Sequence, residues 1–340
     1  MDAAPAAGAP LPIAITLGDA CGIGPEIILK AFAAGLPAPC LVIGDAGLLA
    51  RESARLGLGL RVTEASPGAP FDAESVPVVH AVDLPADLAS GRIDARAGEA
   101  AYLCIERAAA MAMRGEIRAI VTAPISKEAL HRAGHPHPGH TELLAELAGG
   151  VPVRMMLAND ELRTVLVTIH MALRDALDAL SVEGILETVT ITDAALRRAG
   201  IDAPRIAVAG VNPHAGEGGA FGREEIDMVE PAVARARALG IDARGPFAPD
   251  TVFMRARGFA EFDVVIAMYH DQGLIPVKYL GLDAGVNITI GLPFVRTSPD
   301  HGTAFDIAGR PGPDGRGLAD PRSLQAAILQ ADRLSRSAAR

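Results

Sequence analysis

The segment LPIAITLGDACGIGPEIILKAFAAG (residues 11–35) decides the fold class. An apolar run of β character (residues 11–18) leads through a glycine-rich turn into an amphipathic helical stretch (residues 25–35). The same order returns in PCLVIGD (residues 39–45) and AGLLARESARLG (residues 46–57). Such alternation of strand and helix predicts an α/β protein with a largely parallel sheet between helical layers.

Later segments repeat this pattern. Further strands are expected in IRAIVTAP (117–124), LRTVLVTIH (162–170), RIAVAGVNPH (205–214) and DVVIAMYHDQ (263–272). Helices are expected over residues 98–115, 140–150, 181–200 and 224–240. Residues 61–97, rich in Pro, Ala and Asp, indicate irregular or edge structure.

The chain has 340 residues, half of them hydrophobic, so it can bury a large core. We expect a flexible tail over residues 1–11 and a single catalytic unit over residues 12–333, arranged as a three-layer α/β/α structure with two lobes. One lobe is expected to combine residues 12–130 with 285–333. The other is expected to hold residues 131–284.

Composition excludes several classes of protein. The net charge of −10 argues against a nucleic-acid surface, which needs a basic face. No apolar run approaches the roughly 20 residues that span a bilayer, and the N-terminal stretch has no basic residue like those that open secretory signals. Three separated cysteines without CxxC spacing argue against disulfides and thiolate metal sites. We therefore expect a cytoplasmic protein with no membrane or nucleic-acid partner.

Three histidines stand at the ends of predicted strands: His170, His214 and His270. Ligands of parallel sheets bind beyond the carboxyl ends of the strands, and three imidazoles with an open position are typical of a catalytic metal site. Each histidine could equally be an ordinary surface or core residue. The pattern alone leaves both interpretations open, because it does not prove that the strand ends converge.

Only three of the 31 basic residues are lysines. Lys30, at the end of a helical stretch, is interpreted as a solvated surface residue. Lys127 and Lys278 lie inside dense motifs, where a compact ammonium group has uses that arginine cannot serve. Lys278 and Arg296 are the cations that a phosphate or carboxylate would need in this acidic protein.

Two glycine- or proline-rich loops remain. In HPHPGHTE, Thr141 is predicted to cap a helix whose N-terminus attracts an anion, and His135 and His137 are interpreted as loop residues. GDACGIGPE (residues 18–26) follows a strand and opens a helix, but it does not have the GxGxxG spacing. By itself it is weak evidence for a nucleotide loop.

Several motifs, in this order, carry a resemblance over residues 12–333. They are GDACGIGPE, TAPISKEAL, PGHTELLAE, VNPHAGEGGAFGREE, APDTVF, YHDQGLIPVK and GVNITIGLPFVRTSPDHGTAFDIAG. Together they resemble the 4-hydroxythreonine-4-phosphate dehydrogenase family of vitamin B6 biosynthesis. The resemblance implies a fold similar to isocitrate and isopropylmalate dehydrogenases, and a homodimer with its active site at the subunit interface.

The resemblance also implies roles for individual residues. The family's metal ligands correspond to His170, His214 and His270, and its substrate contacts correspond to His140, Thr141, Lys278, Asn287 and Arg296. One divalent ion (zinc, magnesium or cobalt) and NAD, with NADP as the alternative, are the implied cofactors. The implied reaction oxidises the C3 hydroxyl of 4-phosphooxy-L-threonine and loses carbon dioxide to give 3-amino-2-oxopropyl phosphate. The catalytic candidates are Lys278, His140, Asp250 and Asp271. Lys278, Asp250 or Asp271 is expected to relay the proton, and the sequence does not choose among them.

The chain departs from the family pattern at Ala20-Cys21, where Pro-Ala is usual. In addition, VTIHMALRD (residues 167–175) is similar to a branch that acts on D-threonate or D-erythronate 4-phosphate. That sugar-acid activity is the alternative within enzymes. A silent ligand-binding homologue and an acyltransferase-like phosphate binder are the alternatives outside this reaction. Intact candidate ligands argue against the first, and the strand-end histidines argue against the second.

Overall fold

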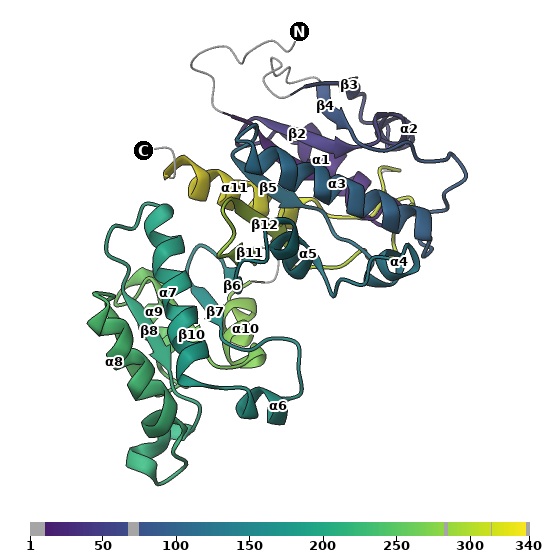
Figure 1. Cartoon of the computed structure of the whole chain (residues 1–340). Coiled ribbons are helices and arrows are strands. Elements are labelled where there is room, and N and C mark those ends of the chain that lie inside the picture. Colours follow the sequence, from purple (N-terminus) through teal and green to yellow (C-terminus); the bar gives the residue numbers. More distant parts are fainter. Residues whose placement is uncertain (1–10, 67–74, 282–284, 314, 338–340) are drawn as a thin grey trace. The chain divides into compact units, whose positions relative to one another are not determined.

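The computed structural model describes residues 11–66, 75–281, 285–313 and 315–337 (Figure 1). They divide into two compact units. Unit 1 combines the described residues up to Val151 with Leu292–Ser335, and unit 2 comprises Pro152–Gly291 and the described residues after Ser335. Residues 131–151 therefore belong to unit 1 and residues 285–291 to unit 2, the reverse of the expected boundaries. Residues 1–10 of the expected tail lie outside the described part.

Unit 1 is built on a parallel sheet in the order β3-β4-β2-β1-β5-β12. Its strands are β1 (Ile13–Thr16), β2 (Cys40–Gly44), β3 (Arg61–Glu64), β4 (Ser75–His80), β5 (Ala119–Thr122) and β12 (Val295–Pro299). Three of them, β1, β2 and β5, are buried along their whole length, as strands covered by helices on both faces must be. The apolar runs in the sequence reflect this double cover.

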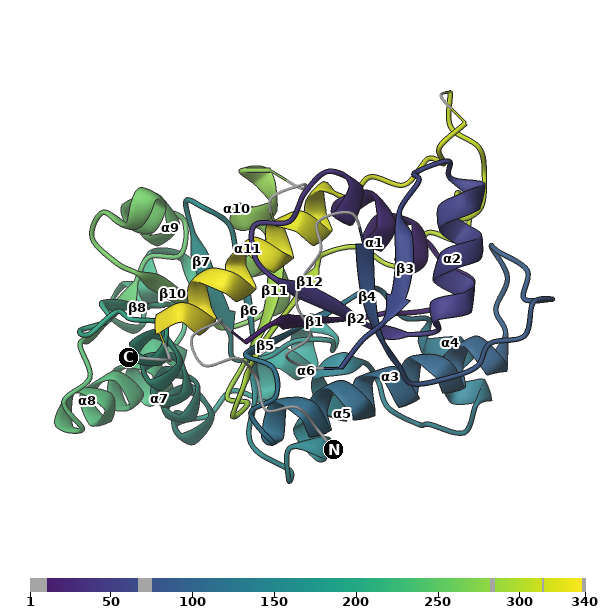
Figure 2. The same cartoon turned by 90° about the horizontal axis from the view of Figure 1, so that it is seen from above.

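Helices form a layer on each face of the unit 1 sheet (Figure 2). One layer contains α1 (Gly24–Ala33), α2 (Ala46–Arg55) and α11 (Arg322–Ser337), and the other contains α3 (Ala95–Met113), α4 (Lys127–Arg132) and α5 (His140–Leu147). Side chains of Asp45, Asp94 and Ser126 accept from backbone N–H groups and so cap α2, α3 and α4. These caps fix where the helices begin.

Unit 2 has a mixed sheet in the order β11-β6-β7-β10-β8-β9. Its strands are β6 (Arg154–Ala158), β7 (Arg163–Leu166), β8 (Ile206–Ala209), β9 (Ala243–Phe247), β10 (Val264–Ala267) and β11 (Val286–Ile290). β7, β10, β8 and β9 are parallel, whereas β6 runs antiparallel to β7 and β11. The four parallel strands consequently end at one common edge.

Helices also cover both faces of the unit 2 sheet (Figure 2). α7 (Val182–Arg198) and α8 (Glu230–Ala238) lie on one face, and α9 (Val252–Ala256) and α10 (His270–Tyr279) lie on the other. The shorter elements are α6 (Leu173–Asp178), η1 (Pro213–Gly219), the π-turn η2 (Glu225–Val229) and η3 (Arg257–Phe259). The predicted α/β class with a largely parallel sheet is confirmed. The likeness to isocitrate and isopropylmalate dehydrogenases stays a prediction.

The expectation of irregular or edge structure over residues 61–97 was partly wrong. β3 is an edge strand, but β4 pairs in parallel with both β3 and β2 and is almost wholly buried. The sequence of this strand, SVPVVH, contains a proline. Since proline lacks the N–H for one ladder hydrogen bond, it argued against a strand in the sequence analysis. Among the described residues, no helix is both long and apolar enough to cross a membrane.

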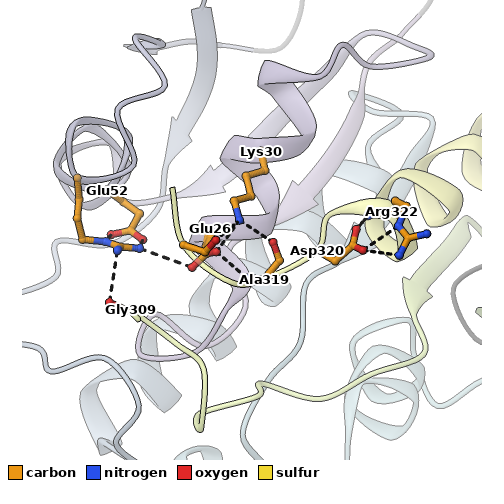
Figure 3. Close-up of polar contacts among 9 residues, drawn as sticks. Glu26, Lys30, Glu52, Gly309, Ala319, Asp320 and Arg322 are labelled. Atoms are coloured by element: carbon orange, nitrogen blue, oxygen red, sulfur yellow. Dashed lines mark hydrogen bonds and ion pairs between the residues drawn. The ribbon is translucent and has the colours of Figure 1, made fainter. Parts of the chain in front are cut away.

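Lys30 is not the solvated surface residue that the sequence suggested. Its ammonium group donates to Glu26 Oε1 at 2.8 Å and to the carbonyls of Gly317 and Ala319 at 3.1 and 2.7 Å (Figure 3). Glu26 is 2% exposed and also accepts from the N–H of Ala319 at 2.7 Å. The Glu26–Lys30 pair therefore fastens the segment before α11 to the first helix of unit 1.

Candidate active site

Four chemically able side chains follow the parallel strands of unit 2. His170 comes four residues after β7, His270 three residues after β10, His214 lies in η1 after β8, and Asp250 lies in the turn after β9. Carboxyl ends of parallel strands share one edge, where ligands of α/β proteins bind. The predicted placement at strand ends is thus observed within unit 2.

His170 and His270 lie side by side. Their ring centroids are 5.7 Å apart, with an interplanar angle of 46°. Both line a cavity of about 240 Å³, together with apolar groups of Ile169, Met171 and Leu173. Two imidazoles facing one small cavity are a suitable pair of nitrogen donors for a divalent cation.

Asp271 orients one ring of this pair. Its Oδ1 lies 2.7 Å from Nδ1 of His270. A carboxylate in this position favours the tautomer with hydrogen on Nδ1, which leaves Nε2 as the nitrogen available to a ligand. The Asp271 carboxylate therefore contacts the imidazole, although its side chain is 72% exposed.

The fit to a metal ion is good for two of the three predicted ligands. Within the described ranges, no three His, Cys, Asp or Glu side chains already form a group that could hold an ion. His214 stands exposed on η1, where its ring packs 6.3 Å from that of Phe221. The three-histidine site therefore stays a prediction, supported by the donor chemistry of the His170–His270 pair.

Close packing of α10 sets the position of His270. An added Cβ on Gly273 would lie 2.4 Å from Leu166 Cδ2 and 2.9 Å from Ala267 Cβ, so the helix touches β7 and β10 directly. Gln272, 9% exposed, accepts from the N–H of Met268 at 2.6 Å and donates to the carbonyl of Gly210 at 2.8 Å. The sequence placed Gln272 at a strand end but gave it no role; in the structure it links the ends of β10 and β8.

Two predicted substrate contacts also belong to unit 2. Lys278 lies in the last turn of α10, eight residues after His270 and therefore about 12 Å further along the helix axis. Asn287 is in β11, and its buried Oδ1 has no hydrogen-bond partner. An unsatisfied buried amide oxygen is costly, which is consistent with a position that a ligand completes.

Unit 1 contains a buried cation, Arg296, which is 3% exposed and donates to Thr122 Oγ1 at 2.7 Å. Burial lowers the pKa of Arg296 to about 9, so the guanidinium is still charged at neutral pH. Burial, helped by Arg296 and Lys127, lowers the pKa of His140 well below its usual value. His140 is therefore a neutral imidazole, and its Nε2 is buried without a hydrogen-bond partner. A cation beside an unsatisfied imidazole suits an anionic group.

The predicted capping role of Thr141 was wrong. α5 begins at His140, Gly139 occupies the capping position with an extended backbone, and no side chain caps the helix. Thr141 is the second residue of the helix. Glycine is an accepted residue at this position. Since it has no side chain to cap the helix, the first amides of α5 are left open to solvent or a ligand.

His135 and His137 make contacts typical of surface loop residues. His135 stacks on Tyr102 with ring centroids 3.7 Å apart, and its Nε2 lies 2.7 Å from a Glu99 carboxylate oxygen. Nε2 of His137 lies 3.0 Å from Glu146. Within the described residues these histidines belong to no metal-binding group.

Asp19, directly after β1, was not singled out from the sequence. It is fully buried, and its Oδ1 accepts from the N–H of Cys21 at 2.8 Å while Oδ2 has no partner. Burial raises the pKa of this carboxyl to about 6, against the effect of backbone hydrogen bonds. The available signal was an acidic residue inside a glycine-rich turn at a strand end.

The family can now be assigned. The model of the family described as "Pyridoxal phosphate biosynthetic protein PdxA" matches residues 37–331. The chain belongs to the PdxA family. Thus the resemblance drawn from the sequence motifs is confirmed at the level of the family.

Individual relatives in the PdxA family have two kinds of name. A protein named 4-hydroxythreonine-4-phosphate dehydrogenase, from Beijerinckia indica subsp. indica, is 52% identical over 329 residues, which cover 95% of each chain. A protein named D-threonate 4-phosphate dehydrogenase, from Salmonella typhimurium, is 50% identical over 305 residues, 87% of this chain and 92% of that one. Both names describe dehydrogenases, so the prediction of an enzyme of this type is confirmed.

A solved structure agrees with this assignment. The crystal structure of 4-hydroxythreonine-4-phosphate dehydrogenase from Klebsiella pneumoniae is 46% identical in sequence and has a TM-score of 0.88. The alignment covers 96% of this chain and 99% of that one. The α/β fold described above is thus the fold of PdxA family enzymes.

Proposed function

We propose that this chain oxidises 4-phosphooxy-L-threonine at C3 with NAD and a divalent cation. The oxidised substrate loses its carboxyl group as carbon dioxide, which gives 3-amino-2-oxopropyl phosphate for pyridoxal phosphate biosynthesis. The observation that carries this proposal is the His170–His270 pair, which lines one cavity at the carboxyl edge of unit 2 with His270 oriented by Asp271.

In this proposal, His170, His214 and His270 hold one divalent cation, which is zinc, magnesium or cobalt. Such a cation, when bound, lowers the pKa of a coordinated hydroxyl and stabilises the negative charge left by decarboxylation. Nicotinamide supplies the hydride acceptor. NAD is proposed as the cofactor, with NADP as the alternative.

The chain's own residues bind and orient the substrate. Arg296 remains charged in its buried position and provides a fixed cation for a phosphate or carboxylate oxygen. His140, kept neutral by its surroundings, can donate or accept a hydrogen bond without adding charge. Thr141, Lys278 and Asn287 complete the proposed set of substrate contacts.

Proton transfer is assigned to Lys278 or Asp250. Asp271 is the less suitable candidate, because its carboxylate lies against the His270 ring. Asp250 is exposed in the turn that follows β9. A carboxylate at this strand end can reach water, which a proton relay requires.

D-threonate 4-phosphate is the second candidate substrate, with D-erythronate 4-phosphate related to it. Relatives with the two names are almost equally similar to this chain, at 52% and 50% identity. The segment that contains His170, VTIHMALRD, also resembles the sugar-acid branch. The two substrates differ in an amine against a hydroxyl, so the reaction type is the same.

Reduction of NAD by the full-length protein tests this proposal. The assay compares the three phosphorylated substrates, with and without a chelator, and then with zinc, magnesium or cobalt restored. We expect the highest kcat/KM with 4-phosphooxy-L-threonine and loss of turnover on chelation. Higher kcat/KM with D-threonate 4-phosphate would establish the second candidate instead.

His214→Ala is expected to abolish metal-dependent turnover, because the cation would lose one of its three ligands. His80→Ala is the matched control, since His80 is exposed and its Nε2 lies 3.1 Å from a carboxylate oxygen of Asp83. Full activity in the His214 variant, or activity unaffected by the chelator, would refute the proposed metal site.

A further inference from the structure

The loop that carries His214 has an unusual backbone. His214, Ala215 and Glu217 have φ angles of 54°, 52° and 44°, and the glycines between and after them are also left-handed. This conformation is unfavourable for any residue other than glycine, because the Cβ lies too close to the following carbonyl oxygen. A run of left-handed residues persists only where the surroundings impose it. One neighbour of this loop is the buried carboxylate of Glu225.

Glu225 is 1% exposed and begins the π-turn η2, at the far end of this loop. Its Oε1 accepts from the backbone N–H groups of Val211 and Asn212 at 2.7 and 2.8 Å. Its Oε2 accepts from the side-chain amide of Asn212 at 3.0 Å. One carboxylate therefore closes the loop by holding the residues just before His214.

Glycines leave room for this carboxylate on both arms of the loop. A Cβ on Gly210 would lie 2.9 Å from Glu225 Oε1, and one on Gly216 would lie 2.6 Å from Oε2. Gly216, with φ 81°, belongs to the left-handed run itself. The glycine-rich sequence thus has a local physical reason: the backbone approaches Glu225 too closely for any side chain.

The carboxylate is ionised where it stands. Burial acts to raise the pKa of Glu225, but the hydrogen bonds from Asn212 and Val211 together outweigh it, and the pKa is lowered. A charged acceptor forms stronger hydrogen bonds than a neutral one. Gln272 adds a second restraint by donating to the carbonyl of Gly210. The base of the loop is fixed, whereas His214 at its tip is exposed.

We propose that Glu225 is a positioning residue for the candidate metal ligand His214: it holds the left-handed loop that presents the imidazole. This inference rests on the proposed function, in which His214 binds the divalent cation. Residues that orient a metal ligand from behind typically change metal affinity 10–100-fold when replaced. Glu225 acts through His214 and touches neither cation nor substrate.

The test is titration of the full-length Glu225→Gln variant with cobalt(II) alone, without substrate or NAD. Glutamine keeps an acceptor oxygen but turns an amide donor toward the amide of Asn212. We expect the Kd for cobalt to rise about 10–100-fold. His214→Ala should weaken cobalt binding at least as much. The double variant should bind cobalt no more weakly than His214→Ala, because both changes act on the same ligand, His214.

Asp263→Asn is the matched control. Asp263 is another nearly buried carboxylate of unit 2, and it accepts from the N–H and guanidinium of Arg205. Its replacement should lower Tm and leave the Kd for cobalt unchanged. A general loss of stability is thereby separated from a loss of loop positioning.

The outcomes divide cleanly. Unchanged cobalt affinity in Glu225→Gln, with weakened binding in His214→Ala, would overturn this inference alone. Unchanged affinity in His214→Ala would overturn the proposed metal set and this inference with it. Additive losses in the double variant would show that Glu225 acts by another route. If Glu225→Gln does not fold, Asn212→Ala removes the side-chain amide that donates to both Glu224 and Glu225 and leaves the two backbone donors to Glu225 in place. Unchanged cobalt affinity there would also overturn the inference.

Discussion

Asp19 and Arg296 show how single buried charges are treated differently in unit 1. Asp19 follows the carboxyl end of β1, whereas Arg296 lies near the amino end of β12, and burial shifts the pKa of each toward neutrality. Arg296 is still charged at pH 7, since its pKa is about 9. Asp19, with a pKa of about 6, exchanges its proton within the range used for enzyme assays.

Asp19 should make the free energy of unfolding depend on pH. Its pKa is raised from 3.8 to about 6 in the folded protein, so the folded state binds the proton more tightly than the unfolded state. This contribution is fully present below about pH 4 and is lost as pH rises through about 6, a difference of up to roughly 3 kcal/mol.

We therefore expect Asp19→Asn to match the wild type near pH 4 and to be more stable than it above pH 7. Urea unfolding at a series of pH values measures this difference. Asp87→Asn, at a carboxyl 73% exposed, serves as the control and should follow the wild-type profile. A constant difference between Asp19→Asn and wild type across the whole pH range would contradict the prediction.

From the sequence, the positions of individual residues could be predicted better than their roles. The strand-end positions of His170, His214 and His270 could be predicted, because a parallel sheet orders its own carboxyl ends. The roles of Lys30 and Thr141 could not. Lys30 binds carbonyls almost 290 positions away in the chain, and no local pattern encodes such a contact.

The helix α10 packs closely against its sheet at Gly273. Glycine in a helix interior normally costs about 0.5–1 kcal/mol relative to alanine. At Gly273 this cost is accepted because a Cβ would collide with Leu166 and Ala267, both fully buried. Overpacking of a tight core typically costs 1–3 kcal/mol, which exceeds the gain in helix propensity.

Gly273→Ala is expected to lower the free energy of unfolding by about 1–2 kcal/mol. Chemical denaturation followed by circular dichroism gives this value. Gly47→Ala in α2 is the comparison, because its new Cβ would meet only side-chain ends at 3.1 and 3.3 Å. If Gly273→Ala stabilised the protein as much as Gly47→Ala, the prediction would be contradicted, because α10 could then move away from the sheet at no energetic cost.

Elements with continuous apolar runs were the predictable ones. β1, β2, β5 and β10 read clearly because both of their faces are covered, so nearly every residue is apolar. β4 was missed because proline interrupts its pattern. The left-handed loop of η1 was beyond prediction as well: its glycines are visible in the sequence, but the carboxylate that shapes it is not recognisable without the fold.

At the scale of the whole molecule, exposed apolar side chains gather near the candidate metal ligands. Met171 and Leu173 line the cavity of His170 and His270 and are 47% and 56% exposed. On α10, Ile275 and Tyr279 lie four residues apart, on one helix face, and are 62% and 89% exposed. We propose that a second copy of the chain covers these side chains in a homodimer.

Ile275→Glu is expected to convert this dimer to a monomer, because an unpaired charge buried in an apolar interface is strongly unfavourable. Sedimentation velocity measures the mass. Leu239→Glu is the control: Leu239 is 66% exposed at the end of α8, away from that cavity lining. A monomeric wild type, or a dimeric Ile275→Glu variant, would contradict the proposed homodimer.

The two-unit organisation was visible in the sequence only in outline. The expected boundaries missed by about twenty residues at one crossing and seven at the other, because turns and helices such as α5 look alike on either side of a boundary. Boundaries depend on which surfaces pack together, and this is a property of long-range contacts.

The return of Leu292–Ser335 to unit 1 has a consequence for biosynthesis. The strand β12 pairs with β5, and the Lys30 ammonium group donates to a carbonyl just before α11. Unit 1 therefore lacks one strand and this hydrogen bond until nearly the whole chain has been synthesised. Residues Pro152–Gly291 of unit 2 are synthesised before Leu292–Ser335, so unit 2 can fold before unit 1 is complete. Order of synthesis and order of completion are therefore opposite in this polypeptide.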